Sequence, residues 1–244
     1  DFFTLGHTST SISLAAGLAK ARDLQGAEGN VIAVIGDGSL SGGEALEGLD
    51  YAKELDGNLI IVVNDNDMSI AENHGGLYTN LKLLRDTKGT AECNLFRAMG
   101  LDYYYVHEGN DVAALIDTFQ KVKDSKKPVV VHIRTLKGKG YAPAEEHKEQ
   151  WHYSGPLETG RSLFEGDEED YSSVSCDYLL DKMKKDPKVV AITAGTPTVI
   201  GFTEDKRREA GKQFVDVGIA EETAVALASG IAAGGGKPVF GVYS

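Results

Sequence analysis

Two polar clusters near the start of the sequence carry residue types that can hold a divalent cation. Asp37 stands between Gly36 and Gly38, and Asn66 closes an Asn-Asp-Asn cluster further along the chain. Carboxylate and amide oxygens are hard ligands that Mg²⁺ and Ca²⁺ prefer, and Mg²⁺ commonly shares its coordination shell with phosphates. The glycines beside Asp37 let a bulky anion approach the backbone. The pattern indicates a site for a metal-bridged diphosphate; the alternative is an ordinary turn in which Asp37 caps a helix.

These glycines complete neither of the two common phosphate-binding motifs. The dinucleotide fingerprint needs a third glycine at position 41, where this chain has Ser41. A P-loop needs Gly-Lys followed by Ser or Thr, and no such sequence follows Gly38. The motif therefore predicts neither a dinucleotide nor a P-loop nucleotide.

Apolar runs rich in β-branched residues must position the two clusters. Residues 31–35 lead into the first cluster and residues 59–63 into the second, with a helical pattern between them, so a β-α-β unit is expected. Ligands of open parallel sheets bind at the carboxyl ends of the strands, where both clusters lie. Strands and helices continue to alternate, which favours an α/β fold with doubly wound parallel sheets. The further strands are expected at residues 101–106, 129–133, 189–193, 213–217 and 238–243.

The sequence suggests two domains. Residues 154–172 contain Gly-Pro and a run of acidic residues and are typical of a solvated linker. We expect a first domain at 1–153 and a second, incomplete domain at 173–244. The chain does not begin with Met and ends just after an apolar run, so we expect a fragment of a longer protein.

Composition limits the partners and the compartment. The net charge of −12 argues against a nucleic-acid partner. No apolar run approaches the ~20 residues of a membrane span, and no signal peptide is recognised. Cys93 and Cys176 lack metal-ligand spacing and are expected to be free thiols in a reducing cytosol. We therefore expect a cytoplasmic protein with no membrane partner.

Five blocks of sequence resemble the 1-deoxy-D-xylulose-5-phosphate synthase family of the transketolase superfamily. They occur in the family's order and are GHTSTSIS (6–13), GDGSLSGGEALEGL (36–49), NDNDMSIAEN (64–73), KGKGYAPAE (137–145) and DVGIAEE (216–222). The resemblance implies a transferase that uses thiamine diphosphate and Mg²⁺ and works as a homodimer. It also implies that 1–153 is a diphosphate-binding domain and that 173–244 begins a pyrimidine-binding domain.

The resemblance assigns roles to individual residues of the first domain. It implies that Asp37, Asn66 and the backbone carbonyl of Met68 bind the metal. The groups that it places at the cofactor's diphosphate are Gly36, Asp37, Gly38, Ser39, Asn66, Met68, Lys137, Thr8 and Ser9. Thr8 and Ser9 could instead only cap a helix, and Lys137 could belong to a solvated basic loop.

Three residues are candidates for proton chemistry. By resemblance, Glu221 hydrogen-bonds N1′ of the cofactor's aminopyrimidine; the alternative is an acid favoured by the helix dipole in a first turn. His7 and His152 resemble histidines on the substrate side, where a group titrating near neutral pH can transfer protons. A structural histidine is the alternative for each.

The reaction implied is the condensation of pyruvate with glyceraldehyde 3-phosphate, with loss of CO₂, to 1-deoxy-D-xylulose 5-phosphate. That product feeds isoprenoid, thiamine and pyridoxal biosynthesis. Two alternatives stay open: ketol transfer from a ketose phosphate, as in transketolase, and a non-catalytic phosphate-binding module. Residues 77–93 replace a longer family insertion, and Glu222-Thr223 replaces the family's Gln-His, so both departures leave the donor open.

Overall fold

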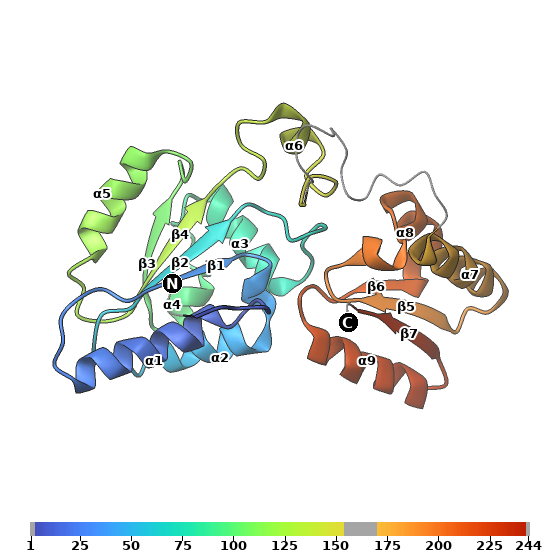
Figure 1. The fold of residues 1–244 in the computed structure, drawn as a ribbon, viewed down its shortest axis with the longest axis horizontal. Coiled ribbons are helices and arrows are strands. Elements are labelled where there is room, and N and C mark those ends of the chain that lie inside the picture. The colour runs from blue at the N-terminus through green and yellow to red at the C-terminus, as the bar shows by residue number, and fades with distance from the viewer. Residues whose placement is uncertain (1–2, 154–169, 243–244) are drawn as a thin grey trace. The chain divides into compact units, whose positions relative to one another are not determined.

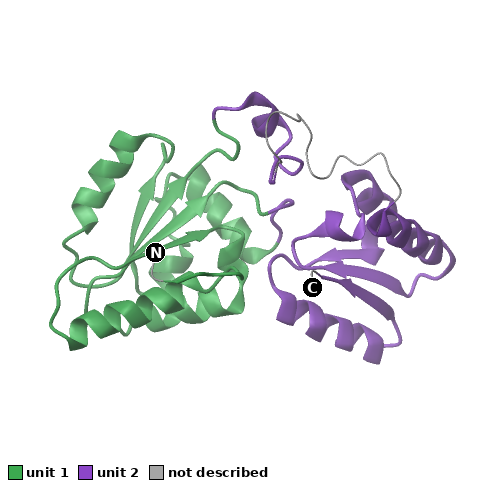
Figure 2. Cartoon of the chain, viewed as in Figure 1, with its two compact units in different colours: residues 1–69, 75–139 green, residues 70–74, 140–244 purple. Residues whose placement is uncertain are grey.

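The computed structural model describes residues 3–153 and 170–242 (Figure 1). It divides into two compact units, drawn in different colours in Figure 2. The first unit comprises residues 1–69 and 75–139, and the second comprises residues 70–74 and 140–244. Each unit is described by itself below.

The first unit is built on a four-stranded sheet in which every pairing is parallel. The strand order is β1-β2-β4-β3, and Gly36 pairs with Asn64 while Asn64 pairs with Ile133. The predicted strands are confirmed with small changes at their ends: β1 (Ile32–Gly36), β2 (Ile60–Asp65), β3 (Asp102–Val106) and β4 (Val129–Arg134). This register brings the carboxyl ends of β1, β2 and β4 to one edge of the sheet.

Helices cover both faces of this sheet, as a doubly wound fold requires. Alternate residues of β2 enter two separate cores: Ile61 and Val63 pack with one set of helices, while Ile60 and Val62 pack against α5. The apolar runs of β2 and β4 are therefore continuous because both faces of these two strands are buried, whereas β1 leaves Ile32 and Val34 exposed on one face. The helices of this unit are α1 (Ser11–Leu24), α2 (Gly43–Ala52), α3 (Gly76–Asp86), α4 (Leu95–Ala98) and α5 (Val112–Val122), with a short 3₁₀ helix η1 (Ser39–Ser41).

The second unit contains a smaller parallel sheet. Its order is β6-β5-β7, with β5 (Val189–Thr193) between β6 (Phe214–Asp216) and β7 (Lys237–Gly241). Its core combines helix α7 with β5 and residues near α8, including Cys176, Leu180, Ala191 and Phe202. The remaining elements are α6 (Ala142–Glu146), α7 (Tyr171–Lys185), η3 (Pro197–Ile200), α8 (Glu204–Ala210), η4 (Gly211–Gln213) and α9 (Glu221–Ala233).

Two details differ from the predicted domain limits. Residues 154–169 of the predicted linker lie outside the described residues, and α7 begins at Tyr171 rather than at Ser173. Asp170 caps this helix, because its side chain accepts a hydrogen bond from the backbone N–H of Ser173 and the Ser173 hydroxyl lies against the Asp170 backbone. Residues 140–153 group with the second compact unit, whereas the predicted boundary assigned them to the first domain. No helix within the described ranges is long and apolar enough to cross a membrane.

Candidate functional site

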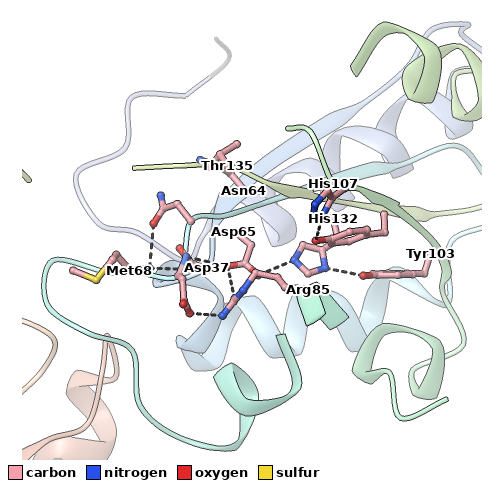
Figure 3. A network of polar contacts seen from close by, with 12 residues as sticks. Asp37, Asn64, Asp65, Met68, Arg85, Tyr103, His107, His132 and Thr135 are labelled. Atoms are coloured by element: carbon pink, nitrogen blue, oxygen red, sulfur yellow. Dashed lines mark hydrogen bonds and ion pairs between the residues drawn. The ribbon is translucent and has the colours of Figure 1, made fainter. Parts of the chain in front are cut away.

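The two polar clusters meet at the backbone N–H of Met68. Asp37 accepts a hydrogen bond from this N–H through Oδ2 at 3.1 Å, and Asn66 accepts from it through Oδ1 at 3.2 Å. Asp37 is 2% exposed, and Figure 3 shows its side chain pointing toward Met68. The parallel register places the ends of β1 and β2 side by side, so clusters separated in the sequence become neighbours.

Asp37 is not the N-cap residue of either of the two helices that follow it. The 3₁₀ helix η1 comes first, and α2 begins at Gly43 with Gly42 as its N-cap and no side-chain cap. The carboxylate is directed to the Met68 turn instead. A side chain that reaches across to a neighbouring strand end suits ligand binding better than local capping.

Lys137 and Ser69 lie at the same sheet edge. The ammonium group of Lys137 donates a hydrogen bond to the backbone carbonyl of Ser69. The Ser69 hydroxyl is buried and has no hydrogen-bond partner within the part of the chain that the structure describes. A Cβ added to Gly38 would lie 2.7 Å from that hydroxyl oxygen, so only glycine lets the two turns approach so closely. Lys137 is thus held beside the polar clusters rather than in a solvated loop.

The Ser-Thr loop before α1 also reaches the first cluster. Ser9 donates a hydrogen bond from its hydroxyl to the backbone carbonyl of Ser39 at 2.7 Å, and the Thr8 hydroxyl lies 3.2 Å from that of Ser9. Ser9 is 7% exposed and has a left-handed backbone with φ of +73°. Thr10 occupies the N-cap position of α1 but makes no side-chain cap bond. Capping alone therefore does not explain this loop.

The three candidates for proton chemistry are placed differently. His7 is exposed in the loop before α1, and its Nδ1 lies 2.9 Å from the carbonyl oxygen of Thr8. His152 and Glu221 belong to the second unit, where His152 is exposed and Glu221 is the first residue of α9 after Ala220. Their predicted roles stay predictions.

A buried polar network that the sequence analysis missed lies behind the second cluster. Arg85 of α3 donates from Nη1 to both carboxylate oxygens of Asp65 at 2.7 Å, and it also pairs with Asp67. His132 of β4 places Nε2 2.8 Å from Asp65 Oδ2, and its Nδ1 lies 2.7 Å from the Tyr103 hydroxyl. Figure 3 shows this chain of contacts from Arg85 to Tyr103. Asp65 and His132 are both 0% exposed.

Charges in this network are balanced by direct pairing. Burial acts to raise the pKa of Asp65, but the hydrogen bonds and charges of His132 and Arg85 outweigh it and hold that pKa below its ordinary value. Burial raises the pKa of Tyr103, so its hydroxyl keeps its proton. A Tyr103 O–H that donates to Nδ1 and a His132 Nε2–H that donates to Asp65 satisfy all three groups.

The available donors at the sheet edge suit a hard cation. Within the described ranges, no group of three or more His, Cys, Asp and Glu side chains is arranged to hold a metal ion. The edge offers instead one carboxylate and one amide oxygen, from Asp37 and Asn66, together with backbone groups and the buried Ser69 hydroxyl. Mg²⁺ is typically bound by one or two protein oxygens plus phosphate oxygens, so this set fits a metal that a phosphate ligand shares.

The fold and the site are those of a parallel α/β protein whose polar side chains gather at the carboxyl edge of one sheet. A family model described as 1-deoxy-D-xylulose-5-phosphate synthase matches residues 1–94 and 85–135. The chain therefore belongs to the 1-deoxy-D-xylulose-5-phosphate synthase family.

Individual relatives agree with the family model. The chain is 40% identical over 280 aligned positions to the 1-deoxy-D-xylulose-5-phosphate synthase of Clostridium perfringens (strain 13 / Type A), covering all of this chain and 45% of that protein. It is 40% identical over 283 positions to 1-deoxy-D-xylulose-5-phosphate synthase 1 of Geobacter metallireducens, with the same coverage. For the enzyme of Listeria monocytogenes the identity is 40% over 255 positions, covering all of this chain and 42% of the relative. The chain thus spans less than half the length of these relatives.

Proposed function

We propose that the first unit binds thiamine diphosphate through Mg²⁺ at the carboxyl edge of its sheet. The single observation that carries this proposal is the convergence of Asp37 and Asn66 on the Met68 N–H, at 3.1 and 3.2 Å. An oxygen-only donor set at a parallel-sheet edge suits a metal-bridged diphosphate, and family membership supports thiamine diphosphate as the ligand.

Within this proposal, each group at the edge has a role set by its chemistry. Asp37, Asn66 and the Met68 carbonyl are the metal ligands. The backbone from Gly36 to Ser39, the hydroxyls of Thr8 and Ser9, and Lys137 form the surroundings of the diphosphate. Lys137 offsets negative charge, while hydroxyl and backbone N–H groups donate hydrogen bonds to phosphate oxygens.

We propose that the complete protein condenses pyruvate with glyceraldehyde 3-phosphate to 1-deoxy-D-xylulose 5-phosphate. When bound, thiamine diphosphate supplies an acidic ring carbon that adds to a carbonyl and a ring that accepts the electron pair freed as CO₂ leaves. Glu221 holds a proton at N1′ of the aminopyrimidine, and His7 and His152 move protons on the substrate side. The product serves isoprenoid, thiamine and pyridoxal biosynthesis. The names of the relatives support this reaction.

Turnover of the complete gene product tests this reaction. Glu221→Gln should keep cofactor binding and lose at least ~10²-fold in turnover, because the proton at N1′ is no longer shared with a carboxylate. Glu222→Gln is the matched control in the same helical turn and should retain turnover. Equal turnover of the Glu221→Gln variant and the unchanged enzyme would refute the role of Glu221. A preference for xylulose 5-phosphate over pyruvate as donor would favour a transketolase-type reaction instead.

We further propose that the complete protein is a homodimer, which the family resemblance alone supports, and that it is cytoplasmic, which its free thiols support. Sedimentation analysis of the complete gene product, with and without cofactor, tests the dimer. A single monomeric species at micromolar concentration under both conditions would contradict it.

A further inference from the structure

Helix α3 contacts both of the turns that carry the proposed ligands. Near its start, Tyr78 donates a hydrogen bond from its hydroxyl to the backbone carbonyl of Gly38 at 3.3 Å. Near its end, Arg85 binds Asp65 and Asp67 on either side of Asn66. One helix thus links the turn after β1 to the turn after β2.

The side chains on either side of Asn66 are held by residues outside the second turn. Asn64 accepts a hydrogen bond from the Thr135 hydroxyl at 2.7 Å, and Asp65 binds Arg85 and His132. Asp67 adopts φ of +63°, a backbone conformation that is uncommon for a residue other than glycine. Because the side chains on both sides of Asn66 are fixed, its amide can be directed toward Met68 and Asp37.

His132 of β4 and Tyr103 of the edge strand β3 connect this turn to the two neighbouring strands of the sheet. The Tyr103 ring is stacked on Phe96 with ring centroids 5.6 Å apart, and Phe96 is completely buried. His132 therefore lies between a rigid aromatic pair on one side and Asp65 on the other. The buried ion pair of the network is that of Arg85 with Asp65, and such a pair seldom adds net stability over apolar packing of the same volume, so its presence is better explained by positional specificity.

We propose that Arg85, Tyr78, His132 and Tyr103 are positioning residues that hold both ligand turns in the metal-binding geometry before the metal arrives. This inference rests on the proposed function. Ordering the turns only on binding would consume part of the binding free energy, and the network removes that cost. Partners behind metal ligands typically contribute ~10–100-fold in metal affinity. Arg85, His132 and Tyr103 therefore act through Asp65 on Asn66 and Met68, and Tyr78 acts through the Gly38 carbonyl on the turn that carries Asp37.

Two conservative variants and one matched control test the proposal on the full 244-residue chain. Arg85→Lys keeps the positive charge but cannot hold Asp65 and Asp67 with a planar fork. Tyr103→Phe removes one hydroxyl and keeps the ring. Tyr104→Phe is the control, because Tyr104 occupies the next position of β3 but is 36% exposed.

Three readouts separate positioning from general stabilisation. The first readout is amide hydrogen exchange at Met68, measured without metal. The second is Mn²⁺ binding in the presence of thiamine diphosphate, measured by electron paramagnetic resonance. The third is unfolding, followed by circular dichroism. If these residues position the turns, exchange at Met68 should be faster in the two variants than in the unchanged chain, and this increase should exceed any increase in α1. The dissociation constant for Mn²⁺ should rise ~10-fold in the variants, with unchanged binding at saturation. The control should match the unchanged chain.

Two results would overturn the inference. The first is an unchanged Met68 exchange rate and Mn²⁺ affinity in both variants. The second is a uniform increase of exchange in α1, α2 and the Met68 turn, which a merely structural role predicts. If neither the unchanged chain nor the complete gene product binds Mn²⁺ with thiamine diphosphate, the proposed function fails, while the exchange measurement still decides whether the network fixes the Met68 turn.

Discussion

Replacing Gly38 with alanine tests how closely the two ligand turns must approach. The added Cβ would lie 2.7 Å from the hydroxyl oxygen, 3.0 Å from Cβ and 3.2 Å from Cα of Ser69. The last of these atoms belongs to the backbone, so rotation of the Ser69 side chain cannot relieve the contact. Gly38 has φ of −60° and ψ of −44°, which suit alanine, so the effect comes from the contact and not from backbone strain.

The size of the effect follows from the hydrogen bonds of the neighbouring residue. Relief requires the Ser69 backbone to move away from the Gly38 turn by a few tenths of an ångström or more. The Met68 N–H bonds to Asp37 and Asn66 are already 3.1 and 3.2 Å long, so such a movement weakens them. A hydrogen bond to a charged group contributes about 1.5–3 kcal/mol. We therefore expect the dissociation constant for thiamine diphosphate with Mg²⁺ to rise ~10–100-fold.

Equilibrium dialysis with thiamine diphosphate at fixed Mg²⁺ measures this change. Gly43→Ala is the control, because a Cβ at Gly43 meets no atom within 4 Å and the residue begins α2. Circular dichroism should show both variants folded. Equal affinity of Gly38→Ala and the unchanged chain would refute the reasoning, as would an equal loss in Gly43→Ala.

Three further outcomes are expected. At about pH 8 a thiol reagent should modify exposed Cys93 but not Cys176, because burial raises the pKa of Cys176 to about 11, and both should react in denaturant. Asp216→Asn should be more stable than the unchanged chain at neutral pH and equal to it below about pH 4, since burial raises the folded-state pKa of Asp216 and its ionisation opposes folding. Asp65→Asn should be less stable than the unchanged chain at neutral pH, because the folded-state pKa of Asp65 is lowered. This difference in stability should be present above the ordinary pKa of an aspartate and should be lost as pH falls through the lowered folded-state pKa of Asp65. Thermal unfolding across this pH range measures the last two, and pH-independent differences would contradict them.

The pattern of apolar residues was sufficient to predict the strands and the parallel α/β class. The pattern placed Ala45, Leu46, Leu49 and Ala52 on one face of the predicted helix; in α2 Leu46 is partly buried and the other three are fully buried. The start of this helix was not predicted, because η1 separates the glycine turn from Gly43. Turn conformations of this kind depend on contacts with distant residues, here Ser9 and Ser69, which periodicity does not record.

The candidate site was predictable only where a short sequence motif marks it. Asp37 and Asn66 each lie in a polar cluster just after an apolar run, so the sheet edge could be expected to bring them together. The support from Arg85 and His132 was not predictable, since it depends on the register of β4 and on where α3 packs. One signal was present in the sequence: His132 is an ionisable residue inside the apolar run 129–133, and a buried ionisable group needs a partner.

Calorimetric titration of the purified chain with thiamine diphosphate tests the central claim most directly. The titration is made with Mg²⁺, with EDTA, and with Asp37→Ala in place of the unchanged chain, and it is repeated on the complete gene product. Binding should require Mg²⁺ and should be weakened at least ~10-fold in Asp37→Ala. Binding of equal strength in EDTA or in Asp37→Ala, or no binding by the complete protein, would contradict it.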